Sequence, residues 1–282
     1  MGASGGARTQ PVFIELMTKR PITVLYGDGH AETWPNIDES TPQRRACARP
    51  KLQQSRYCFR RLRARPFWRS DDAGEPIREL CASFEASFDA IKKEAVRLLP
   101  RDDDDEDEDD GDDAPSASWE AQREGLHSGV WLRCPLWRDH PSAAKNRDAL
   151  PTLSDILSSS NAVMNDAPGR VYLSFMLSGG SSGTAVAPHA GPTNHRLRVH
   201  LPLIIPTTAG SGKRLGISVG GEWREWEEGR CLVLDDSFVH SVDLRGATTN
   251  SISTPSASTT RLLLVCDVRH PDASLLDDAT GL

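Results

Sequence analysis

Short hydrophobic runs, separated by Gly, Pro, Ser and Asn, make up the chain from about Gly129 onward. The clearest runs are VYLSFML, RLRVHLPLIIP, LGISVGG, RCLVLDD and RLLLVCDV. Runs of this length with turn-forming residues between them are typical of antiparallel strands rather than of βαβ units. We therefore predict a mainly β fold, built as an antiparallel sandwich or barrel.

A segment whose hydrophobic residues have helical spacing precedes these runs. Hydrophobic residues recur three and four positions apart at Ile77, Leu80, Cys81, Phe84, Phe88, Ile91, Ala95 and Leu98. This spacing predicts one amphipathic helix packed on the domain, with Pro76 in its first turn and Pro100 at its end. Closer to the N-terminus, PITVLYGDGHAETW predicts a hairpin with a Gly-Asp-Gly turn.

The negative charge of the chain is concentrated in one segment. The formal net charge is −7, and the run from Asp102 to Asp113 holds eleven acidic residues, so the rest of the 282-residue chain carries +4. Such a run repels itself and buries nothing, which predicts a disordered linker. A tail that binds a metal or a basic partner is the alternative. We divide the chain into an N-terminal extension of unknown role, residues 1–55, and one domain, residues 56–282, interrupted by the linker at about 101–117.

The composition argues against several classes of protein. The six cysteines show neither C-x-x-C nor the spacing of zinc ligands. No stretch approaches eighteen apolar residues and the N-terminus has no apolar core, so we predict no membrane segment and, by default, a cytoplasmic location. Arginine alternates with aromatic residues in RYCFRRLRARPFWR, as in some nucleic-acid-binding segments. Because this segment is short, isolated and followed by the acidic run, we predict no nucleic-acid partner.

The run LRVHLPLI places two kinds of side chain on opposite faces of a strand, because side chains alternate. One face carries Leu197, Val199, Leu201 and Leu203, and the other carries Arg198, His200 and Pro202. A barrel lumen that binds an anion would place a guanidinium and an imidazole together in this way. A strand with a solvated polar face fits the same pattern.

Two histidines stand at the ends of predicted strands. His189 precedes a Gly-Pro loop, and His240 ends LDDSFVH. Histidines on separate strands can meet at the mouth of a barrel and bind a transition metal, although two isolated histidines are weak support for a metal site. The common non-haem iron pattern has an acid two residues after the first histidine, where this chain has Gly191. Asp235 or Asp236 could supply a carboxylate or orient His240.

Arg261 opens the strand RLLLVCDV. Its forked guanidinium is suited to holding a carboxylate in two places, so it could anchor a dicarboxylate cosubstrate. An arginine at a strand end in solvent is the other interpretation.

Several of these motifs together resemble one family. PHAGPTNHRLRVHLPLIIP, the W-x-E-G of residues 226–229, LDDSFVHSV and RLLLVCDVRHP resemble the aspartyl/asparaginyl β-hydroxylases. ARPFW, IKKEAVRLL and SGVWLRCPLW are similar to the start of the domain in that family, so the resemblance covers roughly residues 60 to 272. It implies a double-stranded β-helix, a jelly-roll barrel with flanking helices, and an oxygenase that uses Fe(II), 2-oxoglutarate and O2.

The resemblance also implies roles for single residues. His189 and His240 would bind the iron, and Gly191 would be in pattern, because this family has Gly where other members of the fold have the acid and water is expected in its place. Asp235 or Asp236 would then accept a hydrogen bond from His240 or from that water. The residues implied for 2-oxoglutarate are Arg261, Ser174, Arg198, His200 and Trp131.

The resemblance implies hydroxylation of a substrate carbon, most simply Cβ of Asp or Asn in a protein or peptide. Three features depart from the family: a longer loop at residues 178–183, a Ser/Thr-rich insertion at 246–260, and the acidic run. They leave open a lipid or small-molecule substrate. An enzyme that does not use 2-oxoglutarate, such as a cupin-like isomerase, and a non-catalytic β-barrel binding module are the competing classes. Binding and turnover of 2-oxoglutarate distinguish them.

Overall fold

The computed structural model describes most of the domain and three strands before it. The described residues are 11–15, 22–26, 31–34, 53–55, 59, 62–100, 117–123, 125–164, 169–178, 183–206, 215–245 and 260–273. The N-terminal strands form an antiparallel sheet of β1 (Pro11–Glu15), β2 (Ile22–Tyr26) and β3 (Ala31–Trp34), in that order. The pairing of β2 with β3 confirms the predicted hairpin. The acidic run and the Ser/Thr-rich insertion lie outside the described residues.

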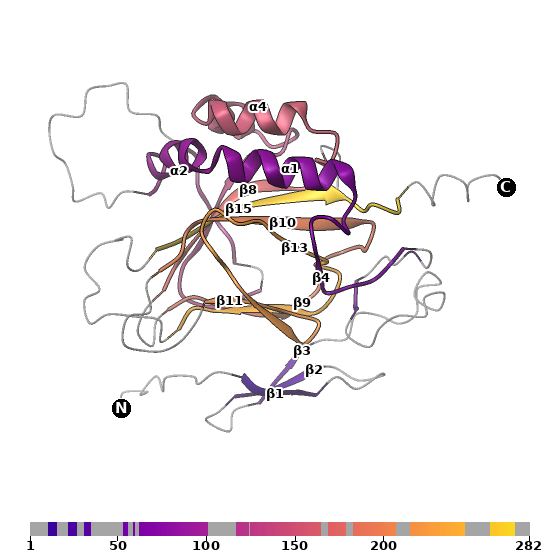
Figure 1. Cartoon of the computed structure of the whole chain (residues 1–282). Coiled ribbons are helices and arrows are strands. Elements are labelled where there is room, and N and C mark those ends of the chain that lie inside the picture. The colour runs from indigo at the N-terminus through magenta and orange to yellow at the C-terminus, as the bar shows by residue number, and fades with distance from the viewer. Residues whose placement is uncertain are drawn as a thin grey trace, which may run out of the picture.

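Two larger antiparallel sheets form the domain (Figure 1). The first has the order β4 (Phe67–Trp68), β13 (Leu232–Leu234), β10 (Arg196–Ile204), β15 (Thr260–Arg269), β8 (Val171–Leu177), β7 (Trp131–Pro135) and β5 (Glu120–Ala121). The second has the order β12 (Glu222–Glu225), β11 (Gly216–Val219), β14 (His240–Asp243), β9 (Ala185–His189) and β6 (Leu126–Ser128). Facing antiparallel sheets of this kind confirm the predicted double-stranded β-helix.

Helices cover the outer face of the first sheet. They are α1 (Glu75–Ala86), α2 (Phe88–Val96), α3 (Ala143–Asp148) and α4 (Pro151–Ser159). Figure 1 shows α1, α2 and α4 above β8, β10 and β15, with the second sheet on the opposite side. The larger hydrophobic core lies between these helices and the first sheet and includes Phe84, Ile91, Leu153 and Leu201.

The prediction of one continuous helix is wrong, because the segment forms two helices, α1 and α2. The helix breaks at Ser87, where φ is −101° and ψ is 13°, and α2 ends at Val96, four residues before Pro100. Serine is a weak helix former because its side chain and backbone find other hydrogen bonds. After the break, Phe88 packs against Gly229, where a Cβ would lie 3.2 Å from the Phe88 ring. The predicted hydrophobic face is nevertheless confirmed, since its residues belong to the core or pack against it.

A second hydrophobic cluster lies between the two sheets and includes Tyr172, Met176, Trp226 and Val265. The alternation predicted along β10 decides which side chains reach this space. Leu197 and Val199 face the helices, so Arg198 and His200 point to the other side of the sheet, between the two sheets. The interpretation of β10 as a strand with a solvated polar face is therefore wrong, because His200 is buried and Arg198 is largely buried.

Two findings concern membrane-spanning segments and cysteines in the described residues. No described helix is long and apolar enough to span a membrane. The four described cysteines, Cys81, Cys134, Cys231 and Cys266, are free thiols. Cys266 is fully buried and Cys231 is partly buried.

Candidate active site

The two histidines predicted as metal ligands lie side by side. His189 ends β9, His240 begins β14, and the two residues are directly opposite each other where these strands pair. Their ring centroids are 4.2 Å apart with an angle of 54° between the ring planes. The strand register thus brings together two side chains that are far apart in the sequence.

Each imidazole is oriented by its own strand. Nδ1 of His189 lies 2.8 Å from the carbonyl oxygen of Ala187, and Nδ1 of His240 lies 2.9 Å from that of Phe238. A carbonyl oxygen only accepts hydrogen bonds, so each Nδ1 carries the proton and Nε2 carries the lone pair. Burial, and then the charge of His189, lowers the pKa of His240 to about 3. Both effects favour neutral imidazole, the form that binds a metal.

Asp236 fills the space beside Gly191. A Cβ built on Gly191 would lie 2.4 Å from Oδ2 of Asp236, and the Gly191 N–H donates to the Asp236 carbonyl oxygen at 2.6 Å. A side chain at position 191 would therefore collide with this carboxylate. Among the described residues, no group of three or more His, Cys, Asp or Glu side chains is arranged to hold a metal. The two imidazoles that the sequence predicts as metal ligands therefore form a pair without a third such side chain arranged beside them in this part of the chain.

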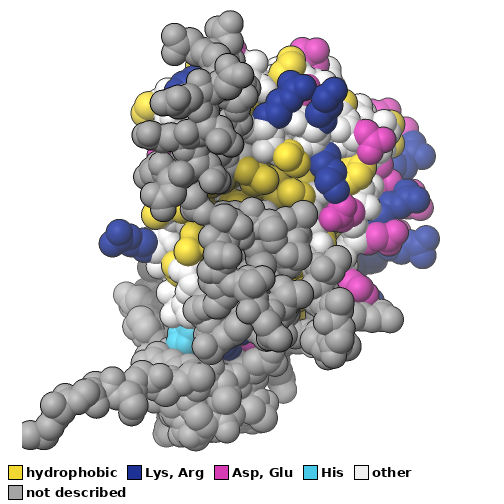
Figure 2. Space-filling view, turned by 90° about the vertical axis from the view of Figure 1, so that its left-hand side faces the viewer, with side chains coloured by type: hydrophobic (Ala, Val, Ile, Leu, Met, Phe, Trp, Pro, Cys, Tyr) yellow, Lys and Arg dark blue, Asp and Glu magenta, His cyan; other side chains and the backbone are white. Residues whose placement is uncertain are grey.

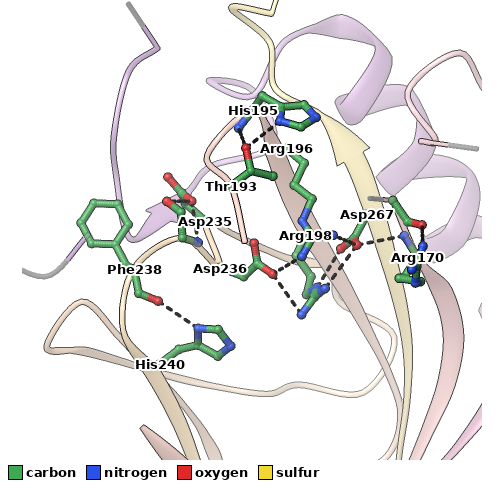
Figure 3. A network of polar contacts seen from close by, with 12 residues as sticks. Arg170, Thr193, His195, Arg196, Arg198, Asp235, Asp236, Phe238, His240 and Asp267 are labelled. Carbon is green, nitrogen blue, oxygen red and sulfur yellow. Dashed lines mark hydrogen bonds and ion pairs between the residues drawn. The ribbon is translucent and has the colours of Figure 1, made fainter. Parts of the chain in front are cut away.

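A buried network of four charges holds Asp236 in place (Figure 3). Its Oδ2 lies 2.7 Å from Nη2 of Arg196 and 3.2 Å from Nη1 of Arg198. Both arginines also contact the Asp267 carboxylate, each at 2.7 Å. Burial alone would raise the pKa of Asp236, but Arg196 and Arg198 hold it well below its usual value. The other oxygen of Asp236, Oδ1, is buried and has no hydrogen-bond partner among the described residues.

Asp235 lies in different surroundings from Asp236. Its Oδ1 accepts hydrogen bonds from the backbone N–H and the hydroxyl of Ser237, and its Oδ2 is 3.4 Å from the amide nitrogen of Gln53. Burial raises the pKa of Asp235 to about 7, although the hydrogen bonds from Ser237 oppose the shift. The two neighbouring acids therefore differ: Asp236 is ionised beside Gly191, whereas Asp235 holds the loop before His240.

Arg261 is a buried cation without a carboxylate partner among the described residues. Its Nη2 donates to the hydroxyl of Ser174 at 2.6 Å, and the Trp131 indole N–H donates to the same oxygen at 3.1 Å. Its guanidinium lies 5.2 Å from the centroid of the Trp226 ring, and its Nε is buried with no hydrogen-bond partner in the part of the chain that the structure describes. Burial lowers the pKa of Arg261 to about 9. A carboxylate brought by a ligand would satisfy both the charge and the Nε donor.

His200 completes this side of the lumen. The Trp226 indole N–H donates to its Nδ1 at 3.3 Å, so Nδ1 accepts and Nε2 carries the proton. Burial, and then the positive charges of Arg198 and Arg261, holds the pKa of His200 well below its usual value. His200 is thus a neutral hydrogen-bond donor in a positively charged space.

The sequence prediction located most of these side chains but missed several partners. Ser174, Trp131 and Arg261 are brought together, whereas the Arg198 guanidinium is engaged by Asp236 and Asp267, and direct contact with the cosubstrate stays a prediction for it. The partners that were missed are Arg196, Asp267 and Trp226. The signal for Asp267 was available, because a carboxylate in the apolar run RLLLVCDV needs a buried cation.

Two residues that precede β4, Gln53 of the N-terminal extension and Phe59, contact the loops that carry the histidines. Gln53 donates to the hydroxyl of Ser237, in the loop before His240. The side-chain amide of Asn194, in the loop after His189, bonds both the N–H and the carbonyl oxygen of Phe59, at 2.8 and 3.0 Å. These contacts were not predicted from the sequence.

Comparison with known proteins decides the family. The family model described as "Aspartyl/Asparaginyl beta-hydroxylase" matches residues 85–271, which is most of the domain. The chain belongs to this family. The mouse aspartyl/asparaginyl β-hydroxylase is 32% identical over 224 residues, which cover 78% of this chain and 25% of the mouse protein. The human protein is 30% identical over 221 residues, 78% of this chain and 24% of its own length. The chain therefore spans about a quarter of the length of these aspartyl/asparaginyl β-hydroxylases.

Another relative in the family is human aspartate β-hydroxylase domain-containing protein 2, 30% identical over 148 residues, 52% of this chain and 35% of that protein. Among solved structures, a 2OG-Fe(II) oxygenase-family oxidoreductase from Burkholderia pseudomallei is 11% identical. The match covers 74% of this chain and 97% of that one at a TM-score of 0.37. A score this low carries no weight for the function of this β-hydroxylase family member.

Proposed function

We propose that this chain is an Fe(II)- and 2-oxoglutarate-dependent dioxygenase that hydroxylates a carbon of its substrate. The observation that carries the proposal is the position of Arg261, a buried guanidinium whose Nε has no partner among the described residues, in the same lumen as the paired histidines. Arg261 and His240 both lie close enough to His200 to lower its pKa. A buried cation without a counter-charge costs several kcal/mol, so the fold holds ready a charge that a carboxylate must balance. A dicarboxylate would balance the charge of Arg261 with one carboxylate, and its other end would reach a metal at the two histidines.

The donor set fits the proposed cofactors. His189 and His240 would hold the iron through Nε2, since Nδ1 of each is bound to a backbone carbonyl. Arg261 and the Ser174 hydroxyl would hold the distal carboxylate of 2-oxoglutarate, with Trp131 fixing the serine. When bound, the iron and O2 supply the oxidation that inserts the hydroxyl group, with 2-oxoglutarate as the co-reductant that becomes succinate and CO2.

The remaining residues of the lumen orient the ligands and balance their charge. His200, as a neutral Nε2 donor, is suited to a carboxylate oxygen of the cosubstrate. Asp236 would accept a hydrogen bond from a water in the space where other members of the fold have an acid, because its Oδ1 is buried and unpartnered among the described residues. Arg196 and Arg198 keep that carboxylate ionised. Asp235 is hydrogen-bonded to Ser237 and instead fixes the loop.

We further propose a protein or peptide substrate, hydroxylated at Cβ of Asp or Asn, in keeping with the names of the relatives. A lipid or a small molecule is the alternative substrate. Figure 2 shows Lys and Arg interspersed with Asp and Glu over the helical part of one face, so no single basic surface for nucleic acid forms there. The cytoplasmic location stays a prediction.

Succinate formation tests the proposed function. Purified chain is supplied with Fe(II), 2-oxoglutarate and O2, with and without a panel of EGF-like peptides that contain Asp or Asn. We expect succinate that depends on both histidines, so that His189→Ala and His240→Ala lose it, and stimulation by at least one peptide. A chain that binds 2-oxoglutarate but forms no succinate with any peptide would favour the binding module. A chain that binds neither iron nor 2-oxoglutarate would exclude the oxygenase.

A further inference from the structure

A second group of arginines surrounds Trp137. The guanidinium carbon of Arg170 lies 5.1 Å from the centroid of the Trp137 ring, and that of Arg133 lies 5.9 Å from it. Arg133 is also 5.8 Å from the ring of Tyr172, which meets Trp137 edge to face at 6.4 Å. We call these four residues the Trp137 cluster. Two cations stacked on one indole form a rigid, positively charged surface.

The cluster lies next to the proposed cosubstrate pocket. Arg133 on β7 is directly opposite Ser174 on β8, and Tyr172 is two residues before Ser174 on the same face. The backbone N–H of Arg170 donates to the Asp267 carboxylate at 3.0 Å, and Figure 3 shows Arg170 on the side of Asp267 away from Asp236. The cluster therefore borders both the proposed cosubstrate site at Arg261 and Ser174 and the buried network of four charges around Asp267.

The positive charge of the cluster is not neutralised within the described residues, where neither Arg133 nor Arg170 forms an ion pair with a carboxylate. In the described part of the chain, Nε of Arg133 is buried without a hydrogen-bond partner, and Nη1 of Arg170 donates to the carbonyl oxygen of Gly169 and to no carboxylate. The nearest acid across the strands is Glu120, opposite Arg133, and its carboxylate accepts from Nε2 of His140 at 2.8 Å. Two permanent cations thus face one acid that is already engaged.

We propose that the Trp137 cluster binds a carboxylate of the prime substrate, namely an acidic side chain of a peptide beside the residue that is hydroxylated. This inference rests on the proposed function. Forked guanidinium groups match a carboxylate in two places, and stacking on Trp137 and Tyr172 holds them ready before the substrate arrives. The cluster borders the proposed cosubstrate site through Arg133 and Tyr172, so a carboxylate bound there would belong to the substrate that is hydroxylated, for which we have proposed a peptide.

Peptide binding to the full chain tests this inference. Two fluorescein-labelled EGF-like peptides with the same target Asp carry either two Glu or two Gln beside it. Their affinities are measured by fluorescence anisotropy with Fe(II) and 2-oxoglutarate present and O2 excluded. We expect the intact chain to prefer the Glu peptide by about tenfold or more, the effect of one charge-assisted hydrogen bond. Arg133→Gln and Arg170→Gln should each remove most of that preference, and Arg133→Lys should restore part of it.

Arg138→Gln is the matched control, because Arg138 is exposed and adjacent to Trp137 but does not stack on it. It should keep the full preference. Equal binding of the two peptides by the intact chain, or binding of neither, would overturn the inference, as would an unchanged preference in both Gln variants with unaltered melting temperatures. Binding to phosphatidylglycerol vesicles is measured for the same proteins. If the intact chain shows no peptide preference but binds these vesicles, and the two Gln variants lose vesicle binding, the cluster binds lipid and the inference is overturned. Binding of 2-oxoglutarate to the intact chain, measured in parallel, shows whether only this inference or the proposed function itself has failed.

Discussion

The Asp236 carboxylate occupies the space that a side chain at Gly191 would need: a Cβ on Gly191 would lie 2.4 Å from Oδ2 of Asp236. The carboxylate beside the histidine pair therefore comes from the loop before His240 and not from the residue two positions after His189. Two arginines keep that carboxylate ionised and fixed. An acid at position 191 and the carboxylate of Asp236 would thus occupy the same space, so the chain can hold only one of them there.

The first prediction concerns this constraint. Gly191→Asp alone should destabilise the chain and weaken metal binding, because the new side chain collides with Asp236. In Gly191→Asp/Asp236→Gly the space is open, so the double variant should recover stability and bind the metal more tightly than Asp236→Gly alone. Thermal unfolding and calorimetric titration with Fe(II) or Mn(II) measure both effects. Additive losses in the double variant would show that the two positions are not coupled.

Replacing Arg261 with Met should raise the stability of the ligand-free chain and lower its affinity for 2-oxoglutarate. Arg261→Met removes a buried cation that has no carboxylate partner among the described residues, so we expect the ligand-free chain to unfold at a higher temperature. The same variant should bind 2-oxoglutarate about 10- to 100-fold more weakly, the effect of losing a hydrogen bond to a charged group. Exposed Arg224→Met should change neither quantity. A variant that is less stable without ligand would contradict the uncompensated burial of Arg261.

Asp267 should matter more for stability than Asp272, whose ion pair with Arg63 is partly exposed. Asp267→Asn takes one of two negative charges from a network in which its side chain is fully buried, and breaking a buried pair costs about 3–5 kcal/mol. Asp272→Asn removes an ion pair with Arg63, whose side chain is 47% exposed, and should cost about 1 kcal/mol or less. Urea unfolding of the two variants compares them directly. Equal losses would mean that the network does not fix the Asp236 loop.

Asp235 predicts a pH dependence of stability. Burial raises its pKa in the folded state to about 7, from an ordinary value of 3.8, so the folded state binds the proton more tightly than the unfolded state. Stability should therefore fall as pH rises from about 4 to 7, and then level off, by an amount on the order of 4 kcal/mol from this group. Asp235→Asn should flatten melting temperature against pH in this window and raise it at pH 8. An unchanged slope would show that Asp235 is not the titrating group.

Much of this site could be predicted from the sequence because two simple rules apply to it. Alternation along β10 placed Arg198 and His200 on one face, and the family motif placed His189 and His240 at facing strand ends. Which cation pairs with which acid could not be predicted, because an ion pair such as that between Arg196 and Asp236 depends on how distant strands and loops come together. The break at Ser87 was missed for a related reason, since a period of hydrophobic residues continues through a local change of backbone direction.

Binding of 2-oxoglutarate is the most direct test of the account. Calorimetric titration of the full chain, with O2 excluded, is carried out with and without Fe(II) for the intact chain, His189→Ala/His240→Ala and Arg261→Met. We predict one site per chain, tighter with Fe(II) than without it, an enhancement by iron that the double histidine variant loses, and weak binding by Arg261→Met in both conditions. Binding that is indifferent to iron, or equally tight in Arg261→Met, would contradict the assignment of this lumen to a metal and its cosubstrate.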